Sequence, residues 1–445
     1  MDSQIWVVAT LLSSIIIIIL TIVKFKIHPF LALLLASFYV GALMGMNPLE
    51  MVNAIEGGIG GTLGFLAAVI GLGTILGNMM EVSGAAERIG ITLQKCRWLS
   101  ADVIMVLVGL VCGITLFVEV GVVLLIPLAF SIAKKTNTSL LKLAIPLCTA
   151  LMAVHCVVPP HPAALFVTNK LGADVGSVIV YGLIVGLAAS LIGGPLFLKL
   201  VGKRLPFKPV PAEFSSVQVR SEQDLPSLGA TLFTVLLPII LMLVKTAAEL
   251  YMAKDSALYT FLEFIGNPIT AMFIAAFVAY YVLGIRRNMG MGTLLTKTEN
   301  GFSSIANILL IIGAGGAFNG ILKASGLADT LAVILSNMDM HPILLAWLVA
   351  ICLHAAVGSV TVAMMGATAI VAPVLPHYPG VSPEIIALAI GSGAIGCTIV
   401  TDSLFWLVKQ YCGATLSEMF KYYTSATFIA SLIALATTFL LSYII

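Results

Sequence analysis

A few ionisable side chains lie inside long apolar stretches of this chain. Glu119 and Asp402 are carboxylates there, and His155, His161 and His354 are imidazoles. An ionisable group within a membrane is costly, faces the protein interior and is by default functional. Glu119 could therefore carry a proton, and Asp402 could bind a substrate ammonium or take part in proton coupling. The alternatives are a Glu119 that only bonds the neighbouring turn, an Asp402 that only caps a helix, and histidines that are only hydrogen-bonded in a core.

Hydroxyl side chains accompany these groups and could hydrogen-bond a small polar solute. Each is equally suited to bond the local backbone, so the set carries more weight than any one member. The candidates are Thr115, Ser359, Thr361, Thr398, Thr401 and Ser403. None of the six arginines lies in an apolar stretch. Helix N-termini, which carry partial positive charge, are therefore the groups expected to attract a substrate carboxylate.

Two apolar stretches, residues 101–133 and 342–373, would position most of these groups. Glycines and polar residues interrupt each stretch near its middle. A helix needs about 20 residues to cross a membrane, so each stretch is too long for one crossing and too short for two. Lys95 precedes the first stretch and Lys134 follows it, and clustered basic residues mark the cytoplasmic side. We therefore expect two re-entrant hairpins, whose irregular turns are tolerated where they line a wet cavity.

Composition places the chain in a membrane. Of its 445 residues, 60% are hydrophobic and 9% are charged, against about 25% charged in soluble domains. Residues 5–23 are expected to be a retained first span, because no basic segment or small-residue cleavage site accompanies them. The seven cysteines lie mostly in apolar runs and indicate small buried hydrophobes rather than a disulfide or metal site. No cofactor, metal or nucleic-acid partner is expected.

The expected fold is an all-α polytopic membrane protein with about ten transmembrane spans, two of them broken, plus two re-entrant hairpins. Basic residues gather in the segments assigned to the cytoplasm, which places both termini in the periplasm. Two glycine-rich spans are expected at residues 57–80 and 301–322. Amphipathic surface segments are expected at 81–99 and 324–340, on opposite faces of the membrane.

The two halves of the chain are expected to be inverted repeats. IGLGTILGNMMEVSGAAERI aligns without a gap with IGAGGAFNGILKASGLADTL, and VVPPH aligns at the same offset with IVTDS. Inverted repeats with discontinuous helices are typical of secondary transporters, whose sites lie near the midplane. The expected units are a first repeat at 1–200 (hairpin 101–133, broken span 139–168), a cytoplasmic linker at 201–225, and a second repeat at 226–445 (hairpin 342–373, broken span 384–410).

Several blocks are specific beyond their hydropathy, among them SGAAERIG, LFVEVGVVLLIPLAFSIAKKTNTSLLKLAIPL, MAVHCVVPPHPAAL, ANILLIIGAGGAFN and GCTIVTDSLFWLVKQYCGAT. Through these blocks the chain resembles the gluconate permease family over nearly its whole length. The resemblance implies an inner-membrane permease for small hydroxylated carboxylates and, from the member most resembled, D-serine as substrate. It also implies membership of the ion-transporter superfamily, with homodimers, an elevator-like motion and proton coupling. It assigns no site residue.

The leading hypothesis is a proton symporter that imports D-serine through the bilayer as a homodimer. A gluconate or other small hydroxy-acid symporter of the same family is the alternative, since both substrates are small hydroxylated carboxylates. A channel would also line a path with polar turns, but it needs no inverted repeat. An enzyme would need a motif such as H-E-x-x-H or a nucleophile beside a base, which the sequence lacks, so no enzymatic activity is expected.

Overall fold

The computed structural model describes residues 3–445 except 97, 203–204, 212–220, 328–329, 331–339, 374 and 379. Among these residues every regular element is a helix, and eight helical stretches are long and apolar enough to cross a membrane. The prediction of an all-α polytopic membrane protein is confirmed. The exact number of spans stays a prediction.

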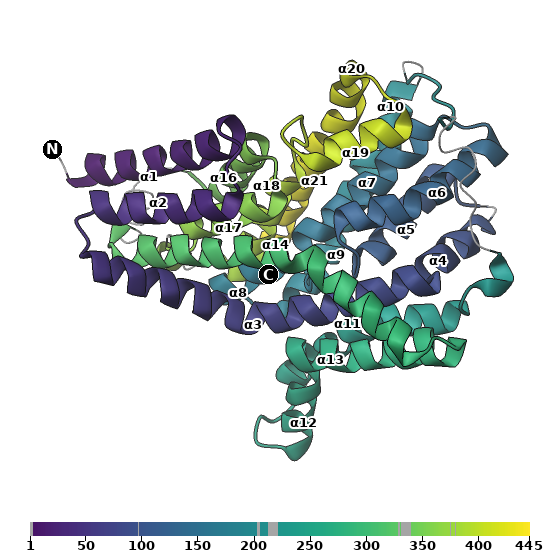
Figure 1. Ribbon diagram of the computed structural model, residues 1–445, viewed down its shortest axis with the longest axis horizontal. Coiled ribbons are helices and arrows are strands. Elements are labelled where there is room, and N and C mark those ends of the chain that lie inside the picture. Colours follow the sequence, from purple (N-terminus) through teal and green to yellow (C-terminus); the bar gives the residue numbers. More distant parts are fainter. Residues whose placement is uncertain are drawn as a thin grey trace.

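The helices follow one another in two similar series (Figure 1). The first series is α1 (Ser3–Ile19), α2 (Pro29–Leu43), α3 (Pro48–Ser83), α4 (Ala85–Gln94), α5 (Ala101–Gly113), α6 (Val118–Thr136), α7 (Leu140–Val157), α8 (Pro162–Leu171), α9 (Val175–Leu191) and α10 (Phe197–Val201). The second series is α11 (Leu228–Tyr251), α12 (Ala257–Gly266), α13 (Pro268–Ala279), α14 (Met291–Ala324), α16 (Pro342–Val357), α17 (Val360–Val371), α18 (Pro383–Ile395), α19 (Ser403–Cys412), α20 (Leu416–Glu418) and α21 (Ser425–Ser442).

The two longest helices, α3 and α14, are longer than the sequence analysis expected. α3 has 36 residues and begins at Pro48, where the Asn47 side chain accepts a hydrogen bond from the Leu49 amide. Proline at the first helical position and asparagine before it are strong start signals, so the helix continues outward through the polar residues that a hydropathy window ends on. The spans expected at 57–80 and 301–322 are therefore only the apolar parts of longer helices.

α3 and α14 cross in opposite directions with their backbones in close contact (Figure 1). A Cβ atom on Gly58 would lie 2.4 Å from the Gly316 carbonyl oxygen, and one on Gly320 would lie 2.6 Å from the Ala54 carbonyl oxygen. Small residues allow helices to approach this closely. Two further glycines face the hairpins: Gly77 of α3 packs on the Thr115 carbonyl, and Gly315 of α14 packs on the Met365 side chain.

α5 and α6 form a helical hairpin against α7. Gly109 of α5 packs on Ala150, and Gly113, one turn further on, packs on Leu151. Gly121, at the start of α6, packs on the same Leu151. α5 therefore runs alongside α7 in the same direction, the chain reverses over residues 114–117, and α6 returns toward the start of α7. That both ends of this hairpin lie on one side of the membrane stays a prediction.

α16 and α17 form a second hairpin against α18. Gly393 of α18 packs on the Trp347 carbonyl and Gly396 packs on Ile351, so α16 and α18 run in the same direction. Gly366 of α17 packs on Leu353 of α16, as expected if α17 folds back along α16. The reversal is tighter than in the first hairpin, because only Gly358 and Ser359 separate the two helices. Figure 1 places the two hairpins toward opposite ends of the molecule.

The starts of corresponding helices lie at nearly the same offset along the chain. In the first half α5, α6, α7 and α8 start at Ala101, Val118, Leu140 and Pro162, and in the second half α16, α17, α18 and α19 start at Pro342, Val360, Pro383 and Ser403. Glycines with positive φ, Gly84 (76°) and Gly326 (70°), follow α3 and α14 at the same offset. These matches support the inverted repeat. Most of the surface segment expected at 324–340 lies outside the described residues.

The described ends of the linker bind the rest of the chain through charged groups. Lys208 Nζ lies 2.9 Å from Glu418 Oε2, so the N-terminal end of the linker contacts the second half. Arg88 Nη1 lies 3.1 Å from Glu222 Oε1, so the C-terminal end contacts the first half. The hydrogen bond from Lys95, with Arg88 nearby, lowers the pKa of the Glu222 carboxyl. Residues 203–204 and 212–220 of the expected linker lie outside the described residues.

One helix has no counterpart in the sequence analysis. α12 follows α11 in the chain, and it projects from the molecule in Figure 1. It begins where the Ser256 side chain accepts a hydrogen bond from the Tyr259 amide, which is an N-cap that satisfies one unpaired donor. With ten residues it is too short to cross a membrane, which needs about 20 residues.

Candidate functional site

A cavity of about 180 Å³ lies where the two hairpin reversals meet α7, α14 and the start of α19. Six of the residues expected to form the site line it: Glu119, His155, Ser359, Thr361, Asp402 and Ser403. These residues are far apart in sequence, and the fold brings them to one place. We call this space the central cavity.

Three helices begin on the wall of the central cavity. α6 starts at Val118, α17 at Val360 and α19 at Ser403, and all three residues line it. The N-terminus of a helix carries partial positive charge and free N–H groups, so it binds anions. Among the described residues that line the cavity, His155 is the only basic one. A carboxylate bound here would therefore be held by backbone rather than by lysine or arginine.

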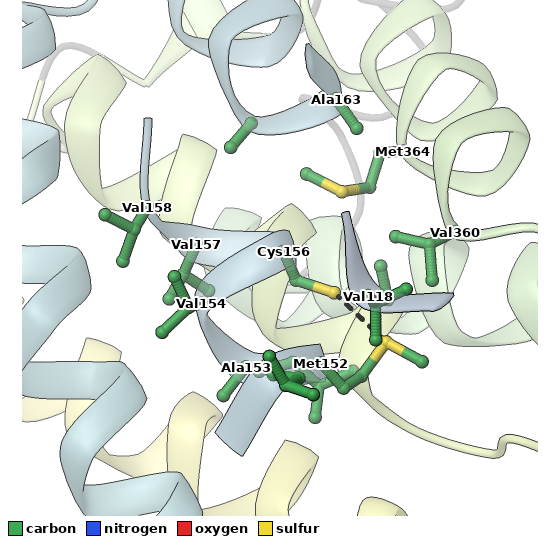
Figure 2. Packing of buried hydrophobic residues seen from close by; sticks show 14 of the residues in the cluster. Val118, Met152, Ala153, Val154, Cys156, Val157, Val158, Ala163, Val360 and Met364 are labelled. Carbon is green, nitrogen blue, oxygen red and sulfur yellow. Dashed lines mark hydrogen bonds between the residues drawn. The ribbon is translucent and has the colours of Figure 1, made fainter. Parts of the chain in front are cut away.

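The first residues of α6 and α17 are buried in the hydrophobic core. Val118 and Val360 occupy equivalent positions in the two halves and lie in one hydrophobic cluster with Met152 and Cys156 of α7 (Figure 2). Val118 is 3% exposed and Val360 is 7% exposed. Burying such side chains contributes about 1.5–3 kcal/mol each. Burial of both valines therefore anchors the two reversals in the core, where both also line the central cavity.

Glu119 lies in the first turn of α6, on the wall of the central cavity. Glu119 is an exposed residue, and apolar as well as polar side chains line the cavity around it. A carboxylate in the first turn of a helix is favoured by the helix dipole. The structure therefore places Glu119 at the hairpin turn and on the wall of a cavity, whereas its role as a proton carrier stays a prediction.

Asp402 is buried and has both oxygens engaged. Oδ1 accepts a hydrogen bond from the Leu404 amide at 2.8 Å and so caps α19. Oδ2 lies 3.2 Å from His354 Nε2. On the other side of the ring, His354 Nδ1 lies 2.6 Å from the Gly396 carbonyl oxygen. The helix-capping alternative is thus present together with a position on the cavity wall, and His354 itself lies behind Asp402.

His155 and His161 form a contact pair on the first broken span. Their ring centroids are 4.8 Å apart in an edge-to-face arrangement. His161 Nε2 contacts the Gly113 carbonyl oxygen at the end of α5. His155 lines the central cavity, and its buried Nδ1 has no hydrogen-bond partner. His161 therefore ties the hairpin to the break, whereas His155 is available to a ligand in the cavity.

The hydroxyl candidates divide between solute contact and backbone support. Thr361 lines the central cavity, as does Ser359, whose oxygen also caps α17 by accepting from the Val362 amide at 3.5 Å. Thr401 lies outside the cavity lining and donates to the Ala355 carbonyl oxygen at 3.1 Å. Thr398 is fully buried, and its hydroxyl has no partner.

Thr115 lines a second cavity, of about 290 Å³, on the other side of the first reversal. This space lies between the reversal and the helices α3 and α14, and it contains Glu81 and Lys297. Phe117 lines both cavities. Thr115 and His161 also line a small pocket of about 20 Å³. The structure therefore separates these two residues from the central cavity.

Asn307 of α14 lines the central cavity and was missed by the sequence analysis. The signal was present, because an amide in the middle of an apolar span is as unusual as a charge there. No group of three or more histidine, cysteine or acidic side chains within the described residues is placed to hold a metal. The seven cysteines are free thiols.

An all-helical membrane fold with interrupted helices around an enclosed polar cavity is the architecture of a membrane transporter. Two solved transporters share the fold. The YdaH transporter of Alcanivorax borkumensis gives a TM-score of 0.57 at 17% identity, over 92% of this chain and 97% of that one. MtrF of Neisseria gonorrhoeae gives 0.63 at 17% identity, over 87% and 83%.

Sequence comparison gives the family. Residues 5–444 match the GntP family permease, and the chain belongs to this family. It is 85% identical over its full length to the D-serine transporter DsdX of Escherichia coli O6:H1, all of which is covered. It is 41% identical to the gluconate permease of Pseudomonas aeruginosa, over 98% of this chain and 97% of that protein. The resemblance to the gluconate permease family is confirmed.

Proposed function

We propose that this permease imports D-serine across the inner membrane by proton symport. The observation that supports the proposal is the central cavity, whose lining brings together a carboxylate, Glu119, with helix N-termini and hydroxyl groups. A hydroxylated amino acid presents the complementary groups: an ammonium for Glu119, a carboxylate for the N-termini and a hydroxyl for Ser359 or Thr361. The 85% identity to a protein named as a D-serine transporter supports this substrate.

Alternating access would follow from movement of the two hairpins with their broken spans against the long helices, in a homodimer. Each hairpin is tied to a break: His161 contacts the Gly113 carbonyl in the first half, and Thr401 donates to the Ala355 carbonyl in the second. These ties favour movement of each hairpin and break as one body. The inverted repeat, with the two hairpins toward opposite ends of the molecule, supports access from either side in turn.

Transport by the purified protein in proteoliposomes tests the function. Under an imposed inward proton gradient, D-serine should accumulate above its external concentration, saturate with concentration and be lost when an uncoupler is added. Gluconate should compete weakly, because it offers no ammonium to Glu119. Stronger competition by gluconate than by unlabelled D-serine would favour the alternative, a hydroxy-acid symporter. Uptake that does not saturate and ignores the uncoupler would contradict a symporter of either kind.

A further inference from the structure

His354 has a hydrogen-bond acceptor at each of its two ring nitrogens. The Gly396 carbonyl oxygen lies 2.6 Å from Nδ1, and Asp402 Oδ2 lies 3.2 Å from Nε2. The imidazole is fully buried, and Asp402 is 5% exposed. A carbonyl oxygen can only accept, so Nδ1 must carry a hydrogen. In a neutral imidazole that leaves Nε2 with a lone pair and no hydrogen.

The contact between Nε2 and Oδ2 then needs one more proton. If Asp402 were ionised and His354 neutral, a lone pair would face a carboxylate oxygen in a buried place, which is repulsive. One additional proton removes the repulsion, either on Nε2, giving an imidazolium beside a carboxylate, or on Oδ2, giving an acid that donates to a neutral ring. The geometry is therefore that of a protonated pair, whichever atom holds the proton.

We propose that the His354–Asp402 pair is the binding site of the transported proton and that Glu119 is left to bind the substrate ammonium. This rests on the proposed proton symport. It reverses the assignment favoured by the sequence, in which Glu119 was the carrier. Asp402 lines the central cavity, so the pair exchanges its proton with water on the cavity side, and it releases the proton when the cavity opens to the other side.

Charge in the central cavity explains how proton and substrate would be coupled. When the pair is protonated it has no net charge, and Glu119 remains the anionic partner for the ammonium while the N-termini hold the carboxylate. When the pair loses its proton, Asp402 adds a second negative charge to the cavity wall and repels the carboxylate. Proton binding thus raises substrate affinity, and by linkage substrate binding raises proton affinity to the same extent.

The groups around the pair are few. Glu119 of α6, Cys156 of α7 and Tyr423 near α21 interact electrostatically with Asp402, and His155 of α7 interacts with His354. Both histidine and carboxylate belong to the second half, and no lysine or arginine within the described lining of the central cavity competes for Asp402. The proton site therefore lies in one half, and the ammonium site lies in the other.

Calorimetric titration of D-serine into the purified protein, repeated in buffers of different ionisation enthalpy, measures the protons taken up on binding. Near neutral pH, binding of one D-serine to the unaltered protein should be accompanied by uptake of at most about one proton. Asp402→Asn and His354→Gln should bind D-serine without taking up a proton. Glu119→Gln, at D-serine concentrations high enough to saturate it, should still take up the proton. His341→Gln, which removes a histidine at the other end of α16, should behave as the unaltered protein.

The outcomes separate this inference from the proposed function. Proton uptake that persists in Asp402→Asn and is lost in Glu119→Gln would overturn the inference and restore Glu119 as the carrier. An unaltered protein that binds D-serine without proton uptake at any pH would overturn the symport itself. Exchange of labelled for unlabelled D-serine in proteoliposomes, which needs no net proton movement, shows that the variants are folded. A His354→Gln variant that fails to fold leaves the isosteric Asp402→Asn to decide.

Discussion

The two hairpins with their adjoining breaks share a backbone plan but divide the chemistry between them. In the first half the carboxylate, Glu119, sits on the hairpin and faces the cavity. In the second half the hairpin carries Thr361 at the equivalent place, and the carboxylate, Asp402, sits on the break with His354 behind it. Two similar backbone arrangements thus carry different side chains. Glu119 is accessible to a ligand in the cavity, whereas Asp402 is in contact with the imidazole of His354.

Another feature is kept in both halves with different side chains. The carbonyls of Gly113 and Ala355 occupy equivalent positions at or near the ends of α5 and α16. The first contacts His161 and the second accepts from Thr401. Carbonyls in the last turn of a helix have no partner within the helix and must be satisfied from outside. Both halves therefore satisfy a carbonyl at this position, but with different side chains.

The largest difference between the hairpins that mutation should reveal is at the second reversal. Gly358 has φ +70°, and a Cβ there would lie 2.1 Å from the Thr401 carbonyl oxygen. Gly358→Ala combines backbone strain with a collision against backbone and should cost at least about 3 kcal/mol. A fall in the thermal unfolding temperature in detergent, measured by fluorescence-detected gel filtration, checks it.

Gly172→Ala is the matched control for that variant. Gly172 has the same φ of +70°, but a Cβ there would meet nothing within 4 Å. It should cost only about 1 kcal/mol, from backbone strain alone. Equal losses in the two variants would show that the close approach of Gly358 to the second break is unimportant.

The next effect is on substrate affinity. Glu119→Gln removes the charge proposed to meet the substrate ammonium and should weaken D-serine binding by about 2 kcal/mol, or roughly thirtyfold. Binding of a hydroxy acid without an ammonium, such as gluconate, should not weaken. Glu56→Gln is the control, because Glu56 is an exposed carboxylate in the same half of the chain. This change should alter the affinity for neither D-serine nor gluconate. Unchanged D-serine affinity in Glu119→Gln would remove the proposed division of roles between the halves.

The smallest effect concerns the residue that replaces the acid in the second half. Thr361→Val removes one neutral hydrogen bond to the substrate hydroxyl and should weaken D-serine binding by about 1 kcal/mol, or roughly fivefold. The control is Thr398→Val, an isosteric change at a buried hydroxyl that has no partner and lies outside the central cavity. Equal effects of the two changes would argue against contact between Thr361 and the substrate.

The sequence was sufficient to predict the fold class and six of the residues that line the central cavity. Hydropathy and basic residues marked the membrane segments, and internal alignment indicated two repeats whose polar breaks were expected to meet near the midplane. Side-chain partners could not be predicted, because the contact of His354 with Asp402 depends on distances across two helices. The ends of α3 were also missed, since the Asn47 cap continues the helix beyond the apolar residues.

The contacts of the two hairpins with the long helices have a consequence for speed. Gly77 of α3 meets the first reversal at the Thr115 carbonyl, and Gly315 of α14 meets Met365 of the second hairpin. A glycine has no side chain, so neither residue interlocks with the hairpin as a larger side chain does when it packs between those of a neighbouring helix. Relative displacement at these two points therefore requires no rotamer on the long helices to change. A larger side chain at either position would collide with a hairpin, since a Cβ on Gly77 would lie 2.7 Å from the Thr115 carbonyl oxygen and one on Gly315 would lie 1.9 Å from Met365 Cε, and it would slow turnover at saturating substrate.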